Sequence, residues 1–427
     1  MAGQSAISAA AAPLGLRLMR ARCKLSRNAG VSLSSFAHSD AAVIAEERPR
    51  RWSIRGLVES NIIGCSDDAA TTRQLLAADV QLRLGIQQER LSGFEQSVRD
   101  YAIVAGNTDV PKQLKSLVRL HESTRQLVGQ MLATEAASSV NAQRLASGVF
   151  DETMCRHGKS VETLADVIIQ VRQMELRLPH ILRRDFMNVD LLDDELISTF
   201  LHARLMIHLL CEHYVSMSKG KGTGVVTLNA DVRDVVDDAL TESKHVADAN
   251  LGVPIEFAIE QWGDLEAPPI IRSWLHHALV EVSKNAMMAN YERWIQQPQS
   301  KHPESVPPGL HVIVDKTCAD VLRIQVKDQG NGLTDEAEAF GFARSSSQER
   351  WSRINEQRSY AAVRQPLGSL GVGLPLSRLM MRIFGGDLTL SNHERNASME
   401  SGCTATLELC CDDSFRAQDH CKLIKSH

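Results

Sequence analysis

Three short motifs in the second half of the chain follow one another in an order that few folds accommodate. EVSKNAMMAN begins at Glu281, DQGNG begins at Asp328, and GVGLPLSR begins at Gly371. The first predicts a helix with an acid and an amide four residues apart, and the second predicts glycines just after a strand. The third predicts a glycine turn that opens another helix. Each motif alone is common, so their order is the informative feature.

The first motif lies in a run that contains no Pro or Gly from Trp274 to Trp294. Its apolar residues recur close to helical spacing and predict a buried stripe of Leu275, Leu279, Val282, Ala286, Ala289 and Ile295. A second stripe is formed by His277, Glu281, Asn285 and Met288. Glu281 is a natural base for a hydroxyl group, and the amide oxygen of Asn285 is a natural Mg²⁺ ligand. We expect His277, one turn before Glu281, to hydrogen-bond its carboxylate; the alternative for the whole stripe is a solvated helix face.

The second motif follows the alternating run Val321–Lys327, which predicts a strand that ends at Asp328. Asp328 can accept a hydrogen bond from an exocyclic amine such as that of adenine. Gly330 and Gly332 would let the backbone approach a ring, because no Cβ stands in the way. The same residues also fit an ordinary turn.

The third motif places Gly371 and Gly373 just before Pro375, which suits the first turn of a helix. The helical pattern then continues to Gly385 and Gly386, which suit a helix end. A glycine turn before a helix presents free N–H groups and the positive end of the helix dipole, both of which suit phosphate. The three motifs in this order predict an ATP site.

The ordered set resembles the N, G1 and G2 boxes of the GHKL ATPase superfamily, and specifically the mitochondrial 2-oxoacid dehydrogenase kinases. The N box of that family, HxxxExxKNAxRA, is matched by His277, Glu281, Lys284, Asn285, Ala286 and Ala289. The similarity extends backward through IIGC at residues 62–65, RHGKSVETLA around His157 and FLHARLMIHLL from Phe200. It covers roughly residues 50–410.

The resemblance implies an α+β chain with an N-terminal domain like a four-helix bundle and a GHKL-type α/β sandwich that binds ATP. It implies a protein-serine kinase that uses ATP and Mg²⁺ to phosphorylate the α-subunit of a 2-oxoacid decarboxylase and so inhibits its dehydrogenase complex. It also implies docking of the helical domain on a lipoyl-bearing domain of the acyltransferase core, and a homodimer. The target complex is the branched-chain or the pyruvate one, and the IIGC stretch favours the branched-chain member.

The same resemblance assigns roles to individual residues. Glu281 would take the serine proton with His277 as its partner, Lys284 would belong to the catalytic set, and Asn285 would hold Mg²⁺. Asp328 would bind the adenine amine, and Gly330 and Gly332 would line the base. The rest of the predicted nucleotide site comprises Gly371, Gly373, Leu374 and Thr404.

Three positions depart from the family pattern and predict weaker phosphate binding. Met288 stands where an Arg is usual, Ser369 stands at the first Gly of the GxGxG, and Cys403 replaces the Thr of a later GT pair. They leave open a binding module whose ATP site has degenerated. A further alternative is a protein histidine kinase that autophosphorylates on His157, although a structural or signalling role is the favoured interpretation of that residue.

Composition and charge disfavour some classes of function and indicate a cellular location. The net charge of −5 argues against a general nucleic-acid or membrane-surface role, and no uninterrupted run of 18 apolar residues is present. Residues 1–40 carry basic residues and no acidic residue before Asp40, which predicts a mitochondrial presequence and a matrix location; the alternative is a disordered basic tail. Nine cysteines without a CxxC pair indicate reduced thiols.

Periodicity predicts two domains after the presequence. Residues 41–220 would be a helical bundle, with apolar stripes in 160–174 and 195–217, and Lys219–Gly224 would mark the boundary. Residues 221–412 would form the ATP-binding domain and 413–427 a tail. The expected strands are Ile255–Ile259, Leu310–Val314, Val321–Lys327, Asp387–Leu390 and Thr404–Leu409. They imply a sheet with helices on one face, and the polar segment Thr334–Leu367 falls where the resembling family has a lid over ATP.

Overall fold

The computed structural model describes residues 49–60, 62–63, 66–104, 110–134, 140–176, 194–263, 268–298, 302, 304–318, 321–343, 371–393 and 401–410. Residues Arg48–His427 form one compact unit, and the description below concerns that unit alone. The predicted presequence, the tail, Cys65, Ser369 and most of the predicted lid segment lie outside the described residues.

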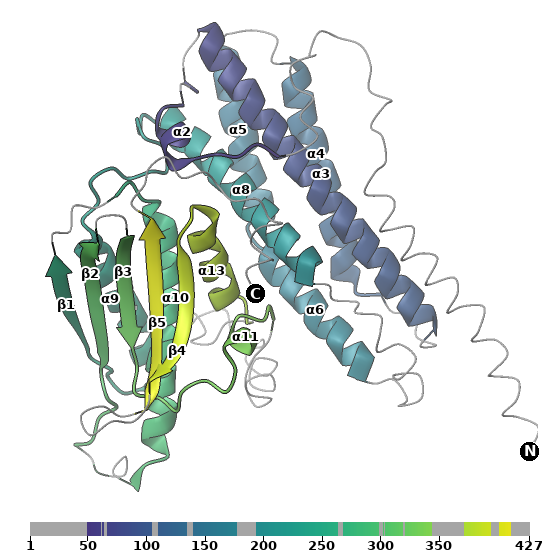
Figure 1. Ribbon diagram of the computed structural model, residues 1–427. Coiled ribbons are helices and arrows are strands. Elements are labelled where there is room, and N and C mark those ends of the chain that lie inside the picture. The colour runs from purple at the N-terminus through teal and green to yellow at the C-terminus, as the bar shows by residue number, and fades with distance from the viewer. Residues whose placement is uncertain are drawn as a thin grey trace, which may run out of the picture. The chain divides into compact units, whose positions relative to one another are not determined.

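The first half of this unit is helical. It comprises α2 (Ile54–Val58), α3 (Asp67–Val104), α4 (Lys112–Thr134), α5 (Val140–His157), α6 (Ser160–Leu176) and α8 (Asp194–Ser218). The long helices α3, α4, α5 and α8 run alongside one another in Figure 1, and α3 packs against both α4 and α8. Both predicted apolar stripes are confirmed, because Leu164, Ile168, Phe200 and Tyr214 are fully buried.

A buried ion pair ties the segment before α2 to α3. The Nε of Arg83 donates to the Oδ2 of Asp79 at 2.9 Å, and both side chains are only 3% exposed. Trp52 donates its ring N–H to the same oxygen at 3.1 Å, and the backbone N–H of Arg50 donates to Oδ1 at 2.8 Å. Both carboxylate oxygens of Asp79 therefore hold residues 50–52 in place.

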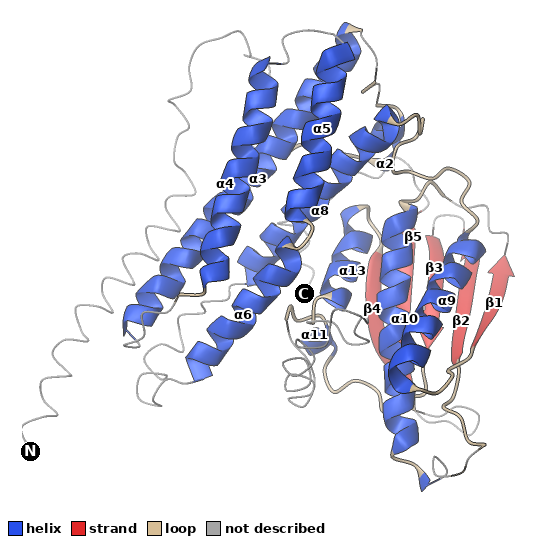
Figure 2. Cartoon of the chain, turned by 180° about the vertical axis from the view of Figure 1, so that it is seen from behind, coloured by secondary structure: helices blue, strands red, loops and turns tan. Residues whose placement is uncertain are grey.

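The second half is a five-stranded sheet with helices on one face, which confirms the expected layer. Its elements are α9 (Val232–Leu251), β1 (Phe257–Gly263), α10 (Arg272–Ile295), β2 (Leu310–Cys318), β3 (Val321–Lys327), α11 (Glu336–Ala339), α13 (Gly373–Ile383), β4 (Asp387–His393) and β5 (Gly402–Cys410). The strand order is β1-β2-β3-β5-β4. β1 pairs with β2 in parallel, and the other neighbours are antiparallel. Helices α9, α10 and α13 cover one side of this sheet (Figure 2).

All five predicted strands are present, and β3 has the predicted bounds. The fold class is therefore confirmed, with a helical region followed by a sheet-containing domain. Helix α8 ends at Ser218 and residues 219–224 lie in turns, but the division at residue 220 stays a prediction.

One predicted core residue is placed wrongly by the periodicity argument. Ile295 is 49% exposed, whereas Leu275, Leu279 and Val282 of the same stripe are buried. The reason is geometric, because the C-terminal end of α10 extends past the sheet (Figure 2).

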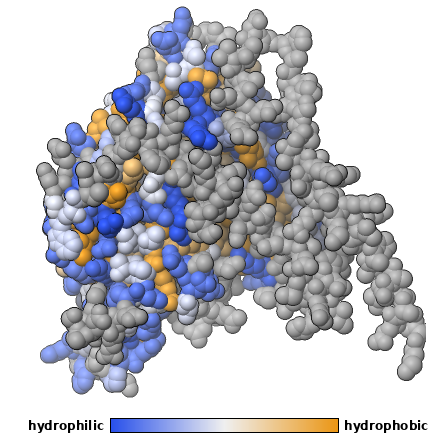
Figure 3. Space-filling model, viewed as in Figure 1, coloured by the Kyte–Doolittle hydropathy of each residue, from blue (hydrophilic) through white to orange (hydrophobic). Residues whose placement is uncertain are grey.

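The surface is mixed in character. In Figure 3 hydrophobic and hydrophilic residues are interspersed on the visible face. Among the described residues, none of the helices is both long enough and apolar enough to cross a membrane.

Candidate nucleotide site

Helix α10 presents the predicted polar stripe on one side and core residues on the other. His277, Glu281, Asn285 and Met288 are all half-buried. Lys284 donates from Nζ to Oε1 of Glu281 at 2.5 Å, and each side chain is 12% exposed. The carboxylate is thus fixed in place by a cation from the same helix face.

Asn285 is oriented by its own helix. Its Nδ2 donates to the backbone carbonyl of Glu281 at 2.9 Å. No described residue donates to its Oδ1. The amide therefore offers an oxygen rather than a nitrogen to a ligand, which is the atom type that Mg²⁺ requires.

His277 differs from the expectation. No hydrogen bond joins it to Glu281 among the described residues, and its Nε2 is buried without a partner. Burial is the main cause that lowers the pKa of His277; the charge of Glu281 opposes the shift, and the charge of Lys284 reinforces it. The ring is consequently neutral near pH 7, and the predicted hydrogen bond to Glu281 is not formed.

The first and third motifs meet at the start of α13. Gly373 is the first residue of that helix, and a Cβ placed on it would lie only 2.8 Å from Cδ of Glu281. Gly371 has a φ of +73°, so the turn before the helix uses a conformation that suits glycine. No side chain caps the N-terminus of α13. The first backbone N–H groups of α13 therefore lie near the Glu281 carboxylate, and no side chain at the cap position accepts a hydrogen bond from them.

Asp328 lies at the end of β3 and is 6% exposed. Its Oδ1 accepts hydrogen bonds from the backbone N–H groups of Gly330 at 2.8 Å and Cys403 at 3.0 Å. Burial raises the pKa of Asp328, and these two hydrogen bonds oppose the shift. No described residue donates to Oδ2, so that oxygen has the capacity to accept a further hydrogen bond.

The two glycines after Asp328 allow close packing of the turn. A Cβ on Gly330 would lie 2.7 Å from Cβ of Ala289 on α10. Gly332 has a φ of +79°, and a Cβ there would lie 2.9 Å from Oδ1 of Asn392. The turn therefore packs directly against α10 at Gly330 and against β4 at Gly332.

Sequence reasoning missed three residues that hold this turn. Asn290 is fully buried, accepts from the N–H of Gln329 at 2.6 Å and donates to the carbonyl of Pro308 at 2.9 Å. Arg293 donates from Nη1 to the carbonyls of Gln329 and Ser401, both at 2.8 Å. The Asn392 amide pairs with both backbone groups of Leu333, at 2.7 Å and 2.8 Å. Only Asn290 gave a signal, as a polar residue four positions after Ala286 on the apolar stripe.

The departures from the family pattern have different consequences. Cys403 is 7% exposed, and burial raises its pKa to about 12; its contact with Asp328 is made by the backbone N–H, so it does not depend on the side chain. Thr404 is 8% exposed, and its hydroxyl lies 3.3 Å from Nδ1 of His393. Leu374 and Met288 are half-buried against the core.

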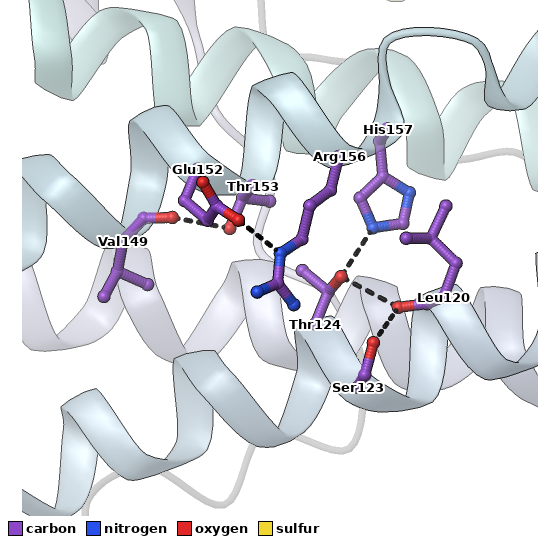
Figure 4. Close-up of polar contacts among 8 residues, drawn as sticks. All are labelled: Leu120, Ser123, Thr124, Val149, Glu152, Thr153, Arg156 and His157. Atoms are coloured by element: carbon purple, nitrogen blue, oxygen red, sulfur yellow. Dashed lines mark hydrogen bonds and ion pairs between the residues drawn. The ribbon is translucent and has the colours of Figure 1, made fainter.

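His157 lies in a different place, inside the helical half (Figure 4). It is 1% exposed, and its Nε2 is 3.0 Å from the hydroxyl oxygen of Thr124. That hydroxyl donates its proton to the carbonyl of Leu120 at 2.8 Å, so Nε2 of His157 must be the donor. Burial, followed by the charges of His121 and Arg204, lowers the pKa of His157 to about 2. A ring with one nitrogen engaged and the other buried without a partner is not placed to attack a nucleotide in solution.

Comparison with known proteins agrees with this geometry. Residues 271–412 match the family described as histidine kinase-, DNA gyrase B-, and HSP90-like ATPase. Pyruvate dehydrogenase (acetyl-transferring) kinase isozyme 4, mitochondrial, of Ictidomys tridecemlineatus is 27% identical over 254 residues, which are 55% of each chain. The isozyme 4 of Homo sapiens is 28% identical over 250 residues, again 55% of each chain. Pyruvate dehydrogenase (acetyl-transferring) kinase, mitochondrial, of Ascaris suum is 26% identical over 258 residues, covering 56% of this chain and 57% of that one.

The chain spans about half the length of the curated relatives it matches. A solved structure, the mycobacterial sensor histidine kinase MprB, is 18% identical and covers 42% of this chain and 95% of that one; its TM-score of 0.28 is too low to carry an argument. The match to the histidine kinase-, DNA gyrase B-, and HSP90-like ATPase family lies within residues 271–412 and indicates an ATPase-like domain in that part of the chain.

Proposed function

We propose that this chain is a protein-serine kinase that phosphorylates the decarboxylase α-subunit of a 2-oxoacid dehydrogenase complex and thereby inhibits it. The observation that carries the proposal is the Glu281 carboxylate, held by Lys284 and lying against Gly373 at the start of α13. It is supported by the similarity to kinases named for pyruvate dehydrogenase. The branched-chain complex is the other target to be tested.

In the proposed reaction Glu281 accepts the proton of the substrate serine while the serine oxygen forms its bond to the γ-phosphorus. The bond from that phosphorus to the bridging oxygen breaks, and ADP leaves. Phosphoryl transfer depends mostly on positioning and on neutralising charge. The N-terminus of α13 suits the phosphates, because its N–H groups lie beside the base. Lys284 orients the carboxylate, and the amine of adenine donates a hydrogen bond to the second oxygen of Asp328.

The residues present also fit Mg²⁺. The Oδ1 of Asn285 would hold it, because the nitrogen of that amide is engaged by the helix. When bound, the cation would neutralise charge on the phosphates and complete its shell with their oxygens and water.

The proposed setting follows from the relatives and from the first residues of the chain. The relatives are named as mitochondrial, and residues 1–40 have the composition of a presequence, so we propose a matrix protein. We propose that residues 41–220 dock on the lipoyl-bearing domain of the acyltransferase core and that the kinase works as a homodimer. These assignments place the enzyme beside its substrate.

Substitution of Glu281 by Gln tests the assigned base. The variant keeps the size of the side chain but cannot take a proton, so serine transfer should fall at least about 100-fold. The Kd for Mg·ATP should stay within about twofold of the native value, since the adenine contacts are untouched. Glu152→Gln on α5, where the carboxylate pairs with Arg156 at an exposed site, is the matched control and should leave transfer unchanged.

The assay uses purified pyruvate and branched-chain decarboxylases in parallel, each with its lipoyl-bearing core. Acid-stable phosphate on a serine of one of them would support the proposal and identify the complex. An unchanged rate in Glu281→Gln would contradict the role of that residue. Acid-labile, base-stable phosphate on the kinase itself, lost in His157→Ala, would support the histidine kinase alternative instead. Absence of any thermal shift with Mg·ATP would support the degenerate module.

A further inference from the structure

A contact between the helical half and the ATPase half lies close to the proposed phosphate site. Arg172 on α6 donates from Nη1 to the backbone carbonyl of Ala343 at 2.6 Å. It also donates from Nη2 to the carbonyl of Phe342 at 3.1 Å. A guanidinium has the fork geometry that two adjacent acceptors require, and hydrogen bonds from a charged donor are stronger than neutral ones.

Ala343 has the backbone conformation of a residue that is held by its surroundings. Its φ is +52°, in the left-handed region that side-chain-bearing residues seldom adopt, and it is completely buried. Its carbonyl is taken by Arg172, and its N–H donates to the carbonyl of Gly371 at 2.9 Å. Such a conformation persists only where neighbouring groups fix it.

Gly371 is the glycine with φ +73° that begins the turn into α13. Two residues later Gly373 lies against Glu281. A continuous path of hydrogen bonds and packing therefore leads from Arg172 through Ala343 and Gly371 to the turn that faces the catalytic carboxylate.

The segment 340–343, which contains Phe342 and Ala343, is also held by a contact within the ATPase half. The guanidinium carbon of Arg378 on α13 lies 4.1 Å from the ring centre of Phe340. This cation–π contact holds the start of the segment on α13 but does not reach the Ala343 carbonyl. Arg172 is thus the contact that fixes the far end of the segment, next to the glycine turn.

We propose that Arg172 is a positioning residue for the phosphate side of the nucleotide site. By holding Phe342 and Ala343, it keeps the Gly371 turn in the geometry that presents the N-terminus of α13 to the ATP phosphates. The inference rests on the proposed ATP site and names a residue outside the ATPase domain that shapes it.

The proposal predicts a selective effect, because the adenine side is held by other residues. Asn290 and Arg293 come from α10 and Asn392 comes from β4, and the hydrogen bonds by which they hold the turn after Asp328 do not involve Arg172. Loss of the Arg172 contacts should therefore weaken binding of the phosphates and leave binding of adenosine unchanged.

The test compares the Kd for Mg·ATP with the Kd for adenosine by calorimetric titration of the full chain. In Arg172→Met, which keeps the length of the side chain but removes its donors, the Kd for Mg·ATP should rise about tenfold, since two charge-assisted hydrogen bonds are lost. The Kd for adenosine should stay within about twofold. Arg172→Lys keeps one donor and the charge, so its Kd for Mg·ATP should lie between those of the native chain and of Arg172→Met.

Arg119→Met on α4 is the matched control, because Arg119 is exposed, and it should leave both constants unchanged. A Kd for Mg·ATP within twofold of the native value in Arg172→Met would overturn the proposal. An equal loss for Mg·ATP and adenosine would overturn it too, since that pattern indicates a general structural defect. If Arg172→Met does not fold, Arg172→Lys decides by the same ratio. A native chain that binds Mg·ATP but phosphorylates neither decarboxylase would refute the proposed kinase function and leave this test intact.

Discussion

Substitution of Gly373 by Ala tests whether the base and the glycine turn form one site. A Cβ on Gly373 would lie 2.8 Å from Cδ of Glu281, whereas ordinary van der Waals contact begins at 3.4 Å. The carboxylate or the helix must therefore move by more than the roughly 0.6 Å that separates these two distances, because Oε2 of Glu281 lies closer still to the Cβ position. Because Lys284 holds the same carboxylate at 2.5 Å, the movement also disturbs that pair.

The expected effect on catalysis is larger than the effect on stability. Overpacking costs about 1–3 kcal/mol, and the helix propensity of Ala over Gly offsets roughly 0.5–1 kcal/mol, so the free energy of unfolding should fall by about 1 kcal/mol. A displacement approaching 1 Å at a reacting group can cost about 100-fold in rate, so kcat should fall by about 10- to 100-fold. Serine transfer at saturating Mg·ATP and urea unfolding measure the two quantities.

Gly148→Ala is the control for the helical glycine itself. Gly148 lies within α5, and a Cβ there would meet nothing within 4 Å. That variant should be more stable by roughly 0.5–1 kcal/mol and should keep its kcat. A Gly373→Ala enzyme with a kcat within twofold of the native value would refute the placement of Glu281 against α13.

Three further predictions concern the adenine side and the helical half. Cys403→Ala should keep the Kd for Mg·ATP within about twofold in the same titration, because the contact to Asp328 is a backbone N–H; a tenfold loss would assign a role to the thiol. Burial raises the pKa of Asp328, so its protonated form appears at a higher pH than for an ordinary Asp, and the Kd for Mg·ATP should rise as pH falls through that range. Asp328→Asn should bind weakly at every pH, and a native Kd that does not change with pH would contradict this reasoning. Asp79→Asn leaves the charge of Arg83 buried without its partner, and the free energy of unfolding in urea should fall by about 3 kcal/mol; a loss below 0.5 kcal/mol would indicate that water reaches the pair.

The sequence predicts β3 well because that strand alternates against a single buried face. In β3 the even-numbered residues Leu322, Ile324 and Val326 are buried, and their neighbours are half-buried, as the alternation requires. Periodicity fails at Ile295, because it reports which side of a helix a residue occupies but not whether another layer extends that far.

Spacing alone could not identify the partner of Glu281. His277 lies four residues before it and Lys284 three residues after it, so both share its helix face. Burial decides between them, because it disfavours the charged imidazole and leaves His277 neutral, while the lysine stays close enough to pair. That choice depends on the layer around α10, which no local pattern reveals.

The sequence could not predict the residues that hold the turn after Asp328, for a related reason. Arg293 bonds a carbonyl 108 residues along the chain, and Asn392 bonds backbone groups 59 residues away. Polar residues that serve distant backbone groups carry no periodicity, so they resemble surface residues in the sequence. Asn290 could be flagged only because it interrupts an apolar stripe.

The departures from the family pattern weigh less once the chemical nature of the contacts is known. Asp328 is held by the N–H groups of Gly330 and Cys403, which are backbone donors present whatever side chain follows. The turn into α13 likewise depends on the φ of Gly371 and on the missing Cβ of Gly373. A Cys in place of a Thr removes none of these groups, so Cys403 gives little support to a degenerate site. Met288 is different, because an Arg there would supply a charge that no backbone group replaces; the degenerate alternative therefore depends on how much phosphate affinity that single charge contributes.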